Sequence, residues 1–407
     1  MKNLLCILLF LASVANIARS QSINYENPLW AFDYMRNAWK NNTDFLEVEK
    51  RIAADSIYVG ADFRDYYGQA LMTVQTFNGN IKGKNQTNNQ FRHSTKKLKE
   101  SEMLNKQIHP ADAGKFIIEN FSDEKIIMFN EAHLYPQHRT FIHSLLTNLY
   151  HKGYKHLFME TLSAEQPVTQ YPERETGIYT NEPCMANLVR TAIQTGFNLH
   201  AYDGYSYANR DSASARNIYN VIRNNPDDKF IVICGFDHNN EKKSQSLASY
   251  LKQIAQIDPL TVDLTIYSEP ESSEYYDELI SFYQIDHPSV LIGKHHKHIV
   301  MKNSSGRDLY VIFPPTVYIH NYPKWMINQH ENKWYPISFN DFDVAKVYIK
   351  EELEQISHPV PYSFKYNDGN KYFLVPKKDF VVKFYKLKDK DWIISGIYDS
   401  SDMKFNK

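Results

Sequence analysis

The stretch Lys125-Ile-Ile-Met-Phe-Asn-Glu-Ala-His133 decides the fold class of this chain. Its apolar run shows no alternation with polar residues, which is typical of a strand covered by helices on both faces of a parallel sheet. The residues that follow, 136–151, carry apolar side chains at helical spacing. The stretch therefore predicts a buried strand that leads into a helix, the first half of a βαβ unit.

The same alternation of short apolar runs and helical patterns continues along the chain. The predicted strands are 125–129, 156–159, 198–202, 230–234, 261–266 and 290–292. The predicted helices are 136–151, 183–195, 211–224, 243–256 and 273–283. Strands that alternate with helices of this length indicate an α/β fold with a mostly parallel sheet flanked by helices. We assign this sheet domain to residues 108–319.

The regions on either side of the sheet domain have other patterns. Residues 25–75 carry aromatic and aliphatic residues at helical spacing, whereas 78–107 are rich in Asn, Lys, Gln and Ser. We therefore predict an N-terminal helical region followed by an exposed polar linker, together spanning 21–107.

The C-terminal residues 320–407 are predicted to form a smaller α+β module. A charged helix is expected near 341–356. Asp368-Gly369 is the expected turn of a hairpin between 362–366 and 371–375. Two further strands are expected at 380–387 and 392–398.

The first twenty residues have the pattern of a cleavable signal peptide. Lys2 is followed by the apolar run 4–12 and then by the small residues of Ala18-Arg19-Ser20. That run is shorter than the roughly 20 residues that a membrane-spanning helix needs. We expect residues 1–20 to be removed. The mature chain would then lie in the periplasm, in the cell envelope or outside the cell, without a transmembrane segment.

Charge and cysteine content narrow the classes of function. The chain has 46 basic and 47 acidic residues, so it lacks the basic footprint of a protein that binds nucleic acid. Cys184 and Cys234 are too few for a disulfide scaffold, and Cys234 lies in an apolar run that predicts a buried free thiol. No Gly-rich phosphate loop, Gly-x-Ser-x-Gly elbow or Cys-x-x-Cys motif is present.

Four predicted strands end in ionisable residues. Glu131 and His133 follow the first strand, and residues two apart on an extended chain point the same way. Glu160, Asp203 and His238 follow the next three strands. Because the carboxyl ends of parallel strands meet at one edge of the sheet, these side chains predict a site there.

The helices after two of these strands add further candidates. His138 and Arg139 lie in the first turn of the helix at 136–151, and His138 shares that helix's apolar face. Arg210 begins the helix after Asp203. We expect His138, Asp203 and Arg210 to contact a ligand, and Arg139 or Arg210 to steady a developing oxyanion.

Two chemistries fit this set, and a third interpretation assigns it no chemistry. Glu131, His133, Glu160 and His238 could hold a divalent metal that activates water. Alternatively, a histidine oriented by a carboxylate could act as a general base without metal. The third interpretation is a buried polar network that only holds the strand ends together.

These residues resemble the erythromycin esterase/ChaN-like superfamily over about residues 120–270. The stretches that carry the resemblance are 126–133 with Gln137-His-Arg139, 153–160, Gly177-Ile-Tyr-Thr180 with Glu182-Pro183, Arg190, Tyr202-Asp203, Arg210-Asp211 with Ala215-Arg216-Asn217, Gly235-Phe-Asp-His238 and 257–263.

The resemblance implies more than one activity. The esterase branch implies a metal-independent hydrolase whose catalytic groups are Glu131, His133 and His238. The Tiki/TraB branch implies a metal-dependent protease, and the ChaN branch implies a haem-binding envelope protein. Asn130 stands where the family usually has Gly, and we expect its side chain to narrow the cleft.

From the sequence we expect an exported hydrolase of an ester or amide, acting on a small molecule or peptide. Its catalytic residues would be Glu131, His133, Glu160, His238 and Arg139. The alternative is an envelope protein that binds haem, iron or another small ligand without catalysis. The pattern leaves the substrate, the cofactor and the oligomeric state open.

Overall fold

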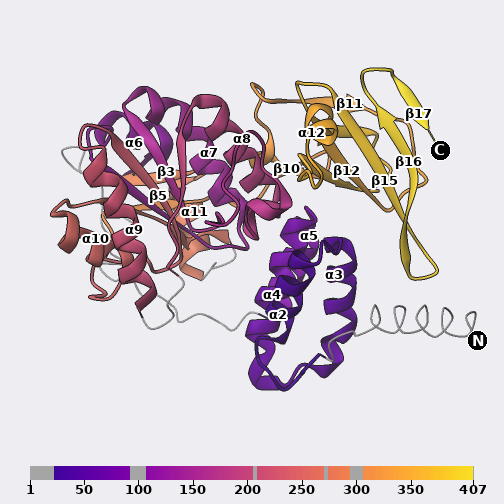
Figure 1. Cartoon of the computed structure of the whole chain (residues 1–407), viewed down its shortest axis with the longest axis horizontal. Helices are drawn as coiled ribbons and strands as arrows, with labels where there is room; N and C mark the ends of the chain where they lie inside the picture. Colours follow the sequence, from indigo (N-terminus) through magenta and orange to yellow (C-terminus); the bar gives the residue numbers. More distant parts are fainter. Residues whose placement is uncertain (1–22, 92–106, 205–208, 270–273, 294–305, 407) are drawn as a thin grey trace, which may run out of the picture.

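The computed structural model describes residues 23–91, 107–204, 209–269, 274–293 and 306–406 (Figure 1). The predicted signal peptide at 1–20 lies outside these ranges. Within them, no helix has both the length and the apolar character needed to span a bilayer.

The central feature is an eight-stranded sheet whose strand order is β1-β7-β8-β6-β2-β5-β3-β4. Strands β8, β6, β2, β5, β3 and β4 are parallel, and β7 runs antiparallel between β1 and β8. The sheet is therefore mostly parallel, as predicted. Its strands are β1 (His109–Asp112), β2 (Ile126–Glu131), β3 (Tyr154–Met159), β4 (Asn198–Ala201), β5 (Lys229–Gly235), β6 (Leu260–Tyr267), β7 (Ser289–Ile292) and β8 (Leu309–Ile312).

All six predicted strands are present, and the sequence pattern missed β1 and β8. The helices of this domain are α6 (Ala113–Asn120), α7 (Pro136–His151), α8 (Pro183–Thr195), α9 (Arg210–Asn224), α10 (Leu247–Ala255) and α11 (Glu274–Tyr283). The pattern also missed α6. Cys184 and Cys234 are buried free thiols, as predicted for Cys234.

Helices cover both faces of the sheet, which explains why β2 is apolar without alternation. Ile127 and Phe129 pack in a core with α6, α7 and α8, whereas Ile126 and Met128 pack in a second core with α9 and α10. All four side chains are fully buried. Each contributes roughly 1.5–3 kcal/mol through burial of apolar surface.

Among the described residues, four α-helices precede the sheet domain: α2 (Trp30–Lys40), α3 (Phe45–Ala54), α4 (Arg64–Phe77) and α5 (Ile81–Phe91). The first three lie where a helical region was predicted. The linker prediction was wrong for 81–91, where the polar sequence is helical because Ile81, Lys84 and Thr87 are buried. Met72 of α4 packs against Ala132, so these helices lie at the carboxyl edge of the sheet (Figure 1).

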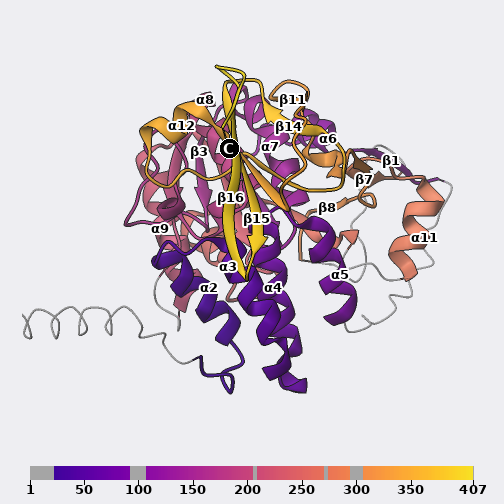
Figure 2. The ribbon, with the colours of Figure 1, turned by 90° about the vertical axis from the view of Figure 1, so that its right-hand side faces the viewer.

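The C-terminal residues form a five-stranded antiparallel sheet in the order β13-β12-β15-β16-β17. Two short pairs, β9–β10 and β11–β14, accompany it. The elements are β9 (Tyr318–Ile319), β10 (Tyr322–Pro323), β11 (Asn332–Pro336), β12 (Val344–Ile349), α12 (Lys350–Gln355), β13 (Ser363–Tyr366), β14 (Tyr372–Pro376), β15 (Phe380–Lys388), β16 (Asp391–Asp399) and β17 (Lys404–Asn406). Strand β16 reaches α3, where the Trp392 amide donates to Glu47 (Figure 2).

Two predictions for this region were wrong. The expected helix at 341–356 is a strand over Val344–Ile349, where every residue is buried, and a helix only from Lys350. The expected hairpin does not form, because β13 pairs with β12 and β14 pairs with β11. The turn between β13 and β14 is held by the segment before β12, because Asn367 donates to the carbonyls of Asn340 and Phe342.

Candidate functional site

The candidate site lies at the carboxyl ends of β2, β5 and β3, which are neighbours in the sheet. Glu131, the last residue of β2, is in register with Gly235, the last residue of β5. Glu160 directly follows β3, and its amide donates to the carbonyl of Ile233 at 3.1 Å. The strand register therefore brings the predicted residues Glu131 and Glu160 to one edge.

Glu131 is buried and held by a guanidinium. Arg139 donates from Nε to Oε2 at 2.7 Å and from Nη2 to Oε1 at 3.1 Å. Burial alone would raise the pKa of Glu131, but the charges of Arg139 and His133 outweigh it and hold that pKa well below its usual range. Glu131 is therefore a permanent carboxylate at neutral pH.

His133 is oriented by this carboxylate. Its Nδ1 lies 2.8 Å from Glu131 Oε1, so Nδ1 carries the proton and the neutral ring has a free lone pair on Nε2. The ring stacks on Tyr179, with centroids 4.0 Å apart and planes at 19°. The side chain remains 21% exposed, so His133 can reach a ligand.

Glu160 is surrounded by positive charge. Arg210 Nη2 donates to Oε1, and the Gly235 amide donates to Oε2. Burial raises the pKa of Glu160, but the charges of His133, Arg210 and His238 lower it by more. Arg210 also donates to both oxygens of Asp203, at 2.6 and 2.8 Å.

His238 forms a second pair of carboxylate and imidazole. Its Nδ1 lies 2.9 Å from Asp211 Oδ2, and the side chain is 28% exposed. Asp211 also accepts from the Leu247 amide at 3.0 Å. Burial lowers the pKa of His238. The hydrogen bond to Asp211 and the charge of Glu160 raise it by more, so the net shift is upward.

Gly235 is where these groups meet. A Cβ at this position would lie 3.0 Å from Glu160 Oε2 and 3.1 Å from His133 Nε2. Glu160 and the free nitrogen of His133 therefore point at the same space above the end of β5. Any side chain at 235 would displace them.

Arg139 and His138 do not have the roles expected from the sequence. Arg139 is fully buried, and beyond Glu131 it donates to Glu182 Oε2 at 3.0 Å and to the His133 carbonyl at 2.9 Å. Because it is fully buried, it positions Glu131 and does not reach the space where an oxyanion would form. Arg210, at 35% exposed, is the guanidinium that a ligand can reach.

His138 is a buried structural residue. Its Nδ1 accepts from the Ala132 amide at 3.2 Å, and its Nε2 lies 2.7 Å from Ser268 Oγ. The ring is therefore neutral, and burial lowers the pKa of His138 to about 3. With no exposed surface, it does not contact a ligand.

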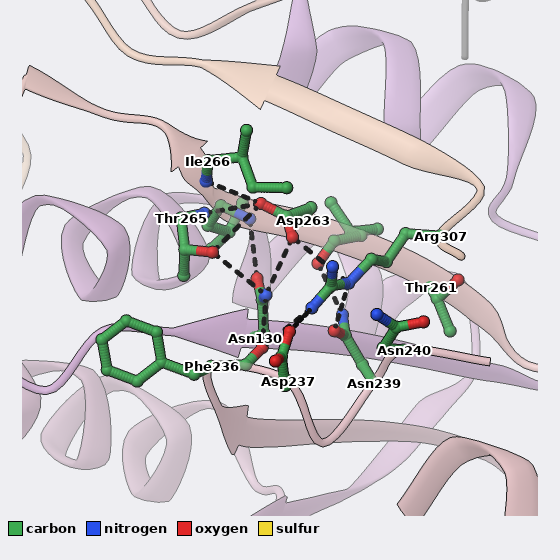
Figure 3. A network of polar contacts seen from close by, with 12 residues as sticks. Asn130, Phe236, Asp237, Asn239, Asn240, Thr261, Asp263, Thr265, Ile266 and Arg307 are labelled. Atoms are coloured by element: carbon green, nitrogen blue, oxygen red, sulfur yellow. Dashed lines mark hydrogen bonds and ion pairs between the residues drawn. The ribbon is translucent and has the colours of Figure 1, made fainter. Parts of the chain in front are cut away.

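Asn130 does not narrow the cleft. Its side chain is buried in the sheet, where Nδ2 donates to the Phe236 carbonyl and to Asp263 Oδ2, and Oδ1 accepts from the Leu264 amide (Figure 3). Arg307 joins Asp263 to Asp237, at 3.2 and 2.7 Å. This network fixes the loop after β5 that carries His238.

The sequence reasoning missed three residues of the site: Tyr179, Glu182 and Asp211. Asp211 had a usable signal, because an acidic residue in the first turn after Arg210 faces the same edge. Glu182 caps α8 by accepting from the Cys184 and Met185 amides, and Glu-Pro is a recognisable helix start. Nothing local indicates that Tyr179 stacks on His133.

The arrangement does not fit a metal ion. Both oxygens of Glu131 and of Glu160 already accept hydrogen bonds, and both histidines use Nδ1 on carboxylates. Within the described ranges no group of three or more His, Cys, Asp or Glu side chains has the geometry to hold a metal. Two free Nε2 atoms are fewer than the three protein ligands of a catalytic zinc site.

Haem does not fit this cluster either. Haem sites have mainly apolar walls, whereas the charged side chains of Glu160, Arg210 and Asp211 surround the two imidazoles. Three cavities of about 340–370 Å³ elsewhere in the molecule include none of the eight predicted site residues in their linings.

The fold and the site together define an α/β protein with a mostly parallel sheet and a charged cluster at its carboxyl edge. This Glu/His cluster consists of Glu131, His133, Glu160 and His238. No family model matches the sequence, and no curated protein matches it. Among solved structures, the type III effector HopBA1 is similar over 52% of this chain and 100% of its own, at 12% identity and a TM-score of 0.32. A chain described as bacterial protein toxins is similar over 51% and 47%, at 18% identity and a TM-score of 0.30. Likenesses this weak carry no inference about function.

Proposed function

We propose that this protein is an exported, metal-independent hydrolase of esters or amides. The observation that carries the proposal is the pair of histidines at this edge. Each is held at Nδ1 by a carboxylate, and no described residue hydrogen-bonds Nε2 of either ring. A histidine oriented in this way is the usual general base or acid of an acyl-transfer site.

In this proposal the two histidines have different tasks. His133 Nε2 takes a proton from water, whose oxygen attacks the carbonyl carbon of the substrate, and Glu131 stabilises the resulting imidazolium. The bond from the carbonyl carbon to the leaving oxygen or nitrogen then breaks, and His238, whose pKa is raised, donates the proton from Nε2 to that atom. Exchange with solvent removes the proton from His133 and returns one to His238. The half-exposed Arg210 is placed to stabilise the oxyanion.

Substitution of the two histidines tests this proposal. The purified chain, assayed on a panel of aryl and alkyl esters, lactones and amides, should hydrolyse at least one class. His133→Ala and His238→Ala should each lower kcat by about 100- to 10,000-fold. His151→Ala, an exposed histidine at the other end of α7, is the matched control and should leave the rate unchanged. Equal rates in all variants would refute the proposal.

The pH profile tests the assignment of His238 as the acid. Activity should fall as the pH rises through the pKa of His238, because the neutral ring cannot donate its proton. Asp211→Asn removes the charge that raises this pKa, so the alkaline limb should move to lower pH. An unchanged alkaline limb would contradict the assignment.

A further inference from the structure

A separate polar cavity of about 340 Å³ lies where the N-terminal helices meet the C-terminal sheet. Its walls come from the ends of α3 and α4, from the segment at 174–181, from the loop at 356–361 and from β12 and β15. No residue of the Glu/His cluster lines it. Nothing in the chemistry proposed for the strand edge uses it.

The lining carries more positive than negative charge. Arg174, Lys346 and Lys383 contribute cations, and Asp44 is the single carboxylate in the lining. Lys346 donates to both oxygens of Asp44, at 2.8 and 2.6 Å. These two charges compensate each other, which leaves Arg174 and Lys383.

Arg174 is held in place by neutral groups. Its Nη2 donates to the carbonyls of Ala38 and Thr43, at 3.1 and 2.7 Å, and its guanidinium lies 4.4 Å from the centre of the Phe45 ring. Carbonyls and an aromatic ring orient the guanidinium, and the charges of Asp44 and Glu175 attract it without a hydrogen bond to either carboxylate. The adjacent Glu175 is outside the lining and bonds His358 Nδ1 at 2.7 Å.

Lys383 is the cation of the lining that no carboxylate of the described residues pairs with. Its side chain is half-buried, and within the described residues no carboxylate lies at ion-pair distance; its named contact is the Tyr348 ring, 5.3 Å from Nζ. Burial alone lowers the pKa of Lys383. A desolvated cation without a counter-ion is unfavourable.

We propose that this cavity binds a compact dianion of the phosphate monoester class, held by Lys383 and Arg174. The lining has three cations and one carboxylate, so its net charge is positive, and the oxygens of such a group accept from both a guanidinium and an ammonium. The cavity volume suits a small phosphorylated molecule.

The cavity is connected to the strand edge through one wall. Asn181 in that wall donates to the carbonyls of Arg174 and Gly177. The same segment carries Tyr179, which stacks on His133, and ends at Glu182, which bonds Arg139. A bound anion would therefore hold the segment that shapes one side of the Glu/His cluster.

Calorimetric titration of the full chain with inorganic phosphate, at constant ionic strength, tests the binding. Wild type should bind saturably, and Lys383→Met should weaken binding at least tenfold. Lys388→Met, an exposed lysine on the same strand, makes the same change of charge and should bind as wild type. Absence of saturable binding to wild type, or equal binding by both variants, would overturn the proposal.

Two further measurements keep the result independent of folding and of the hydrolase proposal. Without phosphate, Lys383→Met should melt at or above the wild-type temperature because it removes a half-buried cation that no described carboxylate pairs with. Phosphate should raise the melting temperature of wild type but not of this variant. Lys383→Arg should restore binding. Tighter binding of malonate than of phosphate would overturn the phosphate assignment in favour of a dicarboxylate.

Discussion

At the scale of single residues, Arg139 stabilises the folded chain by pairing with two buried carboxylates. It is fully buried and donates to Glu131, Glu182 and the His133 carbonyl. Arg139→Met would leave two carboxylates buried without a counter-charge, so we expect a loss of about 3–5 kcal/mol in the free energy of unfolding. Urea titration followed by circular dichroism measures it. Arg223→Met, at an exposed position, should change stability by less than about 0.5 kcal/mol. A loss below about 1 kcal/mol for Arg139→Met would show that the pair is solvated in solution.

His138 makes the stability of the protein depend on pH, because its pKa is lowered by burial in the folded chain. Its pKa is about 3 in the folded chain because burial disfavours the charged ring, against about 6.5 in the unfolded chain. Between these values the unfolded chain binds the proton and the folded chain does not. Stability is therefore lost as the pH falls below about 6.5, by up to about 1.4 kcal/mol per pH unit.

His138→Gln should remove this contribution. The Gln side chain can still hydrogen-bond near Ser268 but does not titrate, so the difference in slope between wild type and variant, measured by urea unfolding from pH 6.5 to 4.5, should approach about 1.4 kcal/mol per unit. His151→Gln, an exposed histidine, should keep the wild-type slope. Parallel slopes for wild type and His138→Gln would show that His138 titrates normally.

For whole elements, the sequence predicted strands and helices where burial alone specifies them. Strand β2 is apolar on both faces, and both faces are covered. The prediction failed where partners far away in the sequence decide the outcome. Strand β12 was expected to be helical, yet its charged Lys346 is neutralised by Asp44 from the N-terminal region. Helix α5 is polar in sequence but is held by packing that no local pattern reveals.

The candidate site could be predicted in location but only partly in composition. The sequence predicted that Glu131, His133, Glu160 and His238 lie close together, because the carboxyl ends of parallel strands share an edge. The local pattern could not show which arginine is buried, because that depends on Glu182, which lies 43 residues beyond Arg139. It also could not place Tyr179, whose position depends on the packing of the N-terminal helices around it.

The end of strand β5 has no room for a side chain at position 235, and a substitution can test this. In Gly235→Ala the new Cβ would lie about 3 Å from Glu160 Oε2 and His133 Nε2, so both side chains must move. We expect at least a tenfold loss of hydrolysis and a shift of the His133 ring resonances in NMR spectra, with a loss of stability no greater than about 1–3 kcal/mol. Gly60→Ala, where the nearest atom to a Cβ lies at 3.7 Å, is the control. Unchanged His133 resonances in Gly235→Ala would contradict the geometry.

In the whole molecule, three parts contact one another through a few polar bridges. The N-terminal helices reach the C-terminal sheet through the Asp44–Lys346 pair. The sheet domain reaches it through Arg190 of α8, which donates to both oxygens of Glu352 in α12, at 2.7 and 2.6 Å, and to the Val360 carbonyl. Both Arg190 and Glu352 are buried, so this bridge holds two parts together without water to screen its charges.

Removing one side of that bridge should let the C-terminal module unfold before the sheet domain. Arg190→Met leaves the Glu352 charge buried and unpaired, so we expect a loss of about 3–5 kcal/mol and a second, earlier transition in urea unfolding as the C-terminal module loosens. The double variant Arg190→Met/Glu352→Met replaces the ion pair by apolar side chains of similar length and should recover most of the loss. Lys115→Met/Glu119→Met, an exposed pair on α6, is the matched control and should change stability by less than about 1 kcal/mol. If the double variant were as unstable as Arg190→Met, the loss would come from the Val360 hydrogen bond and from packing, because the buried charge of Glu352 would no longer be present to explain it.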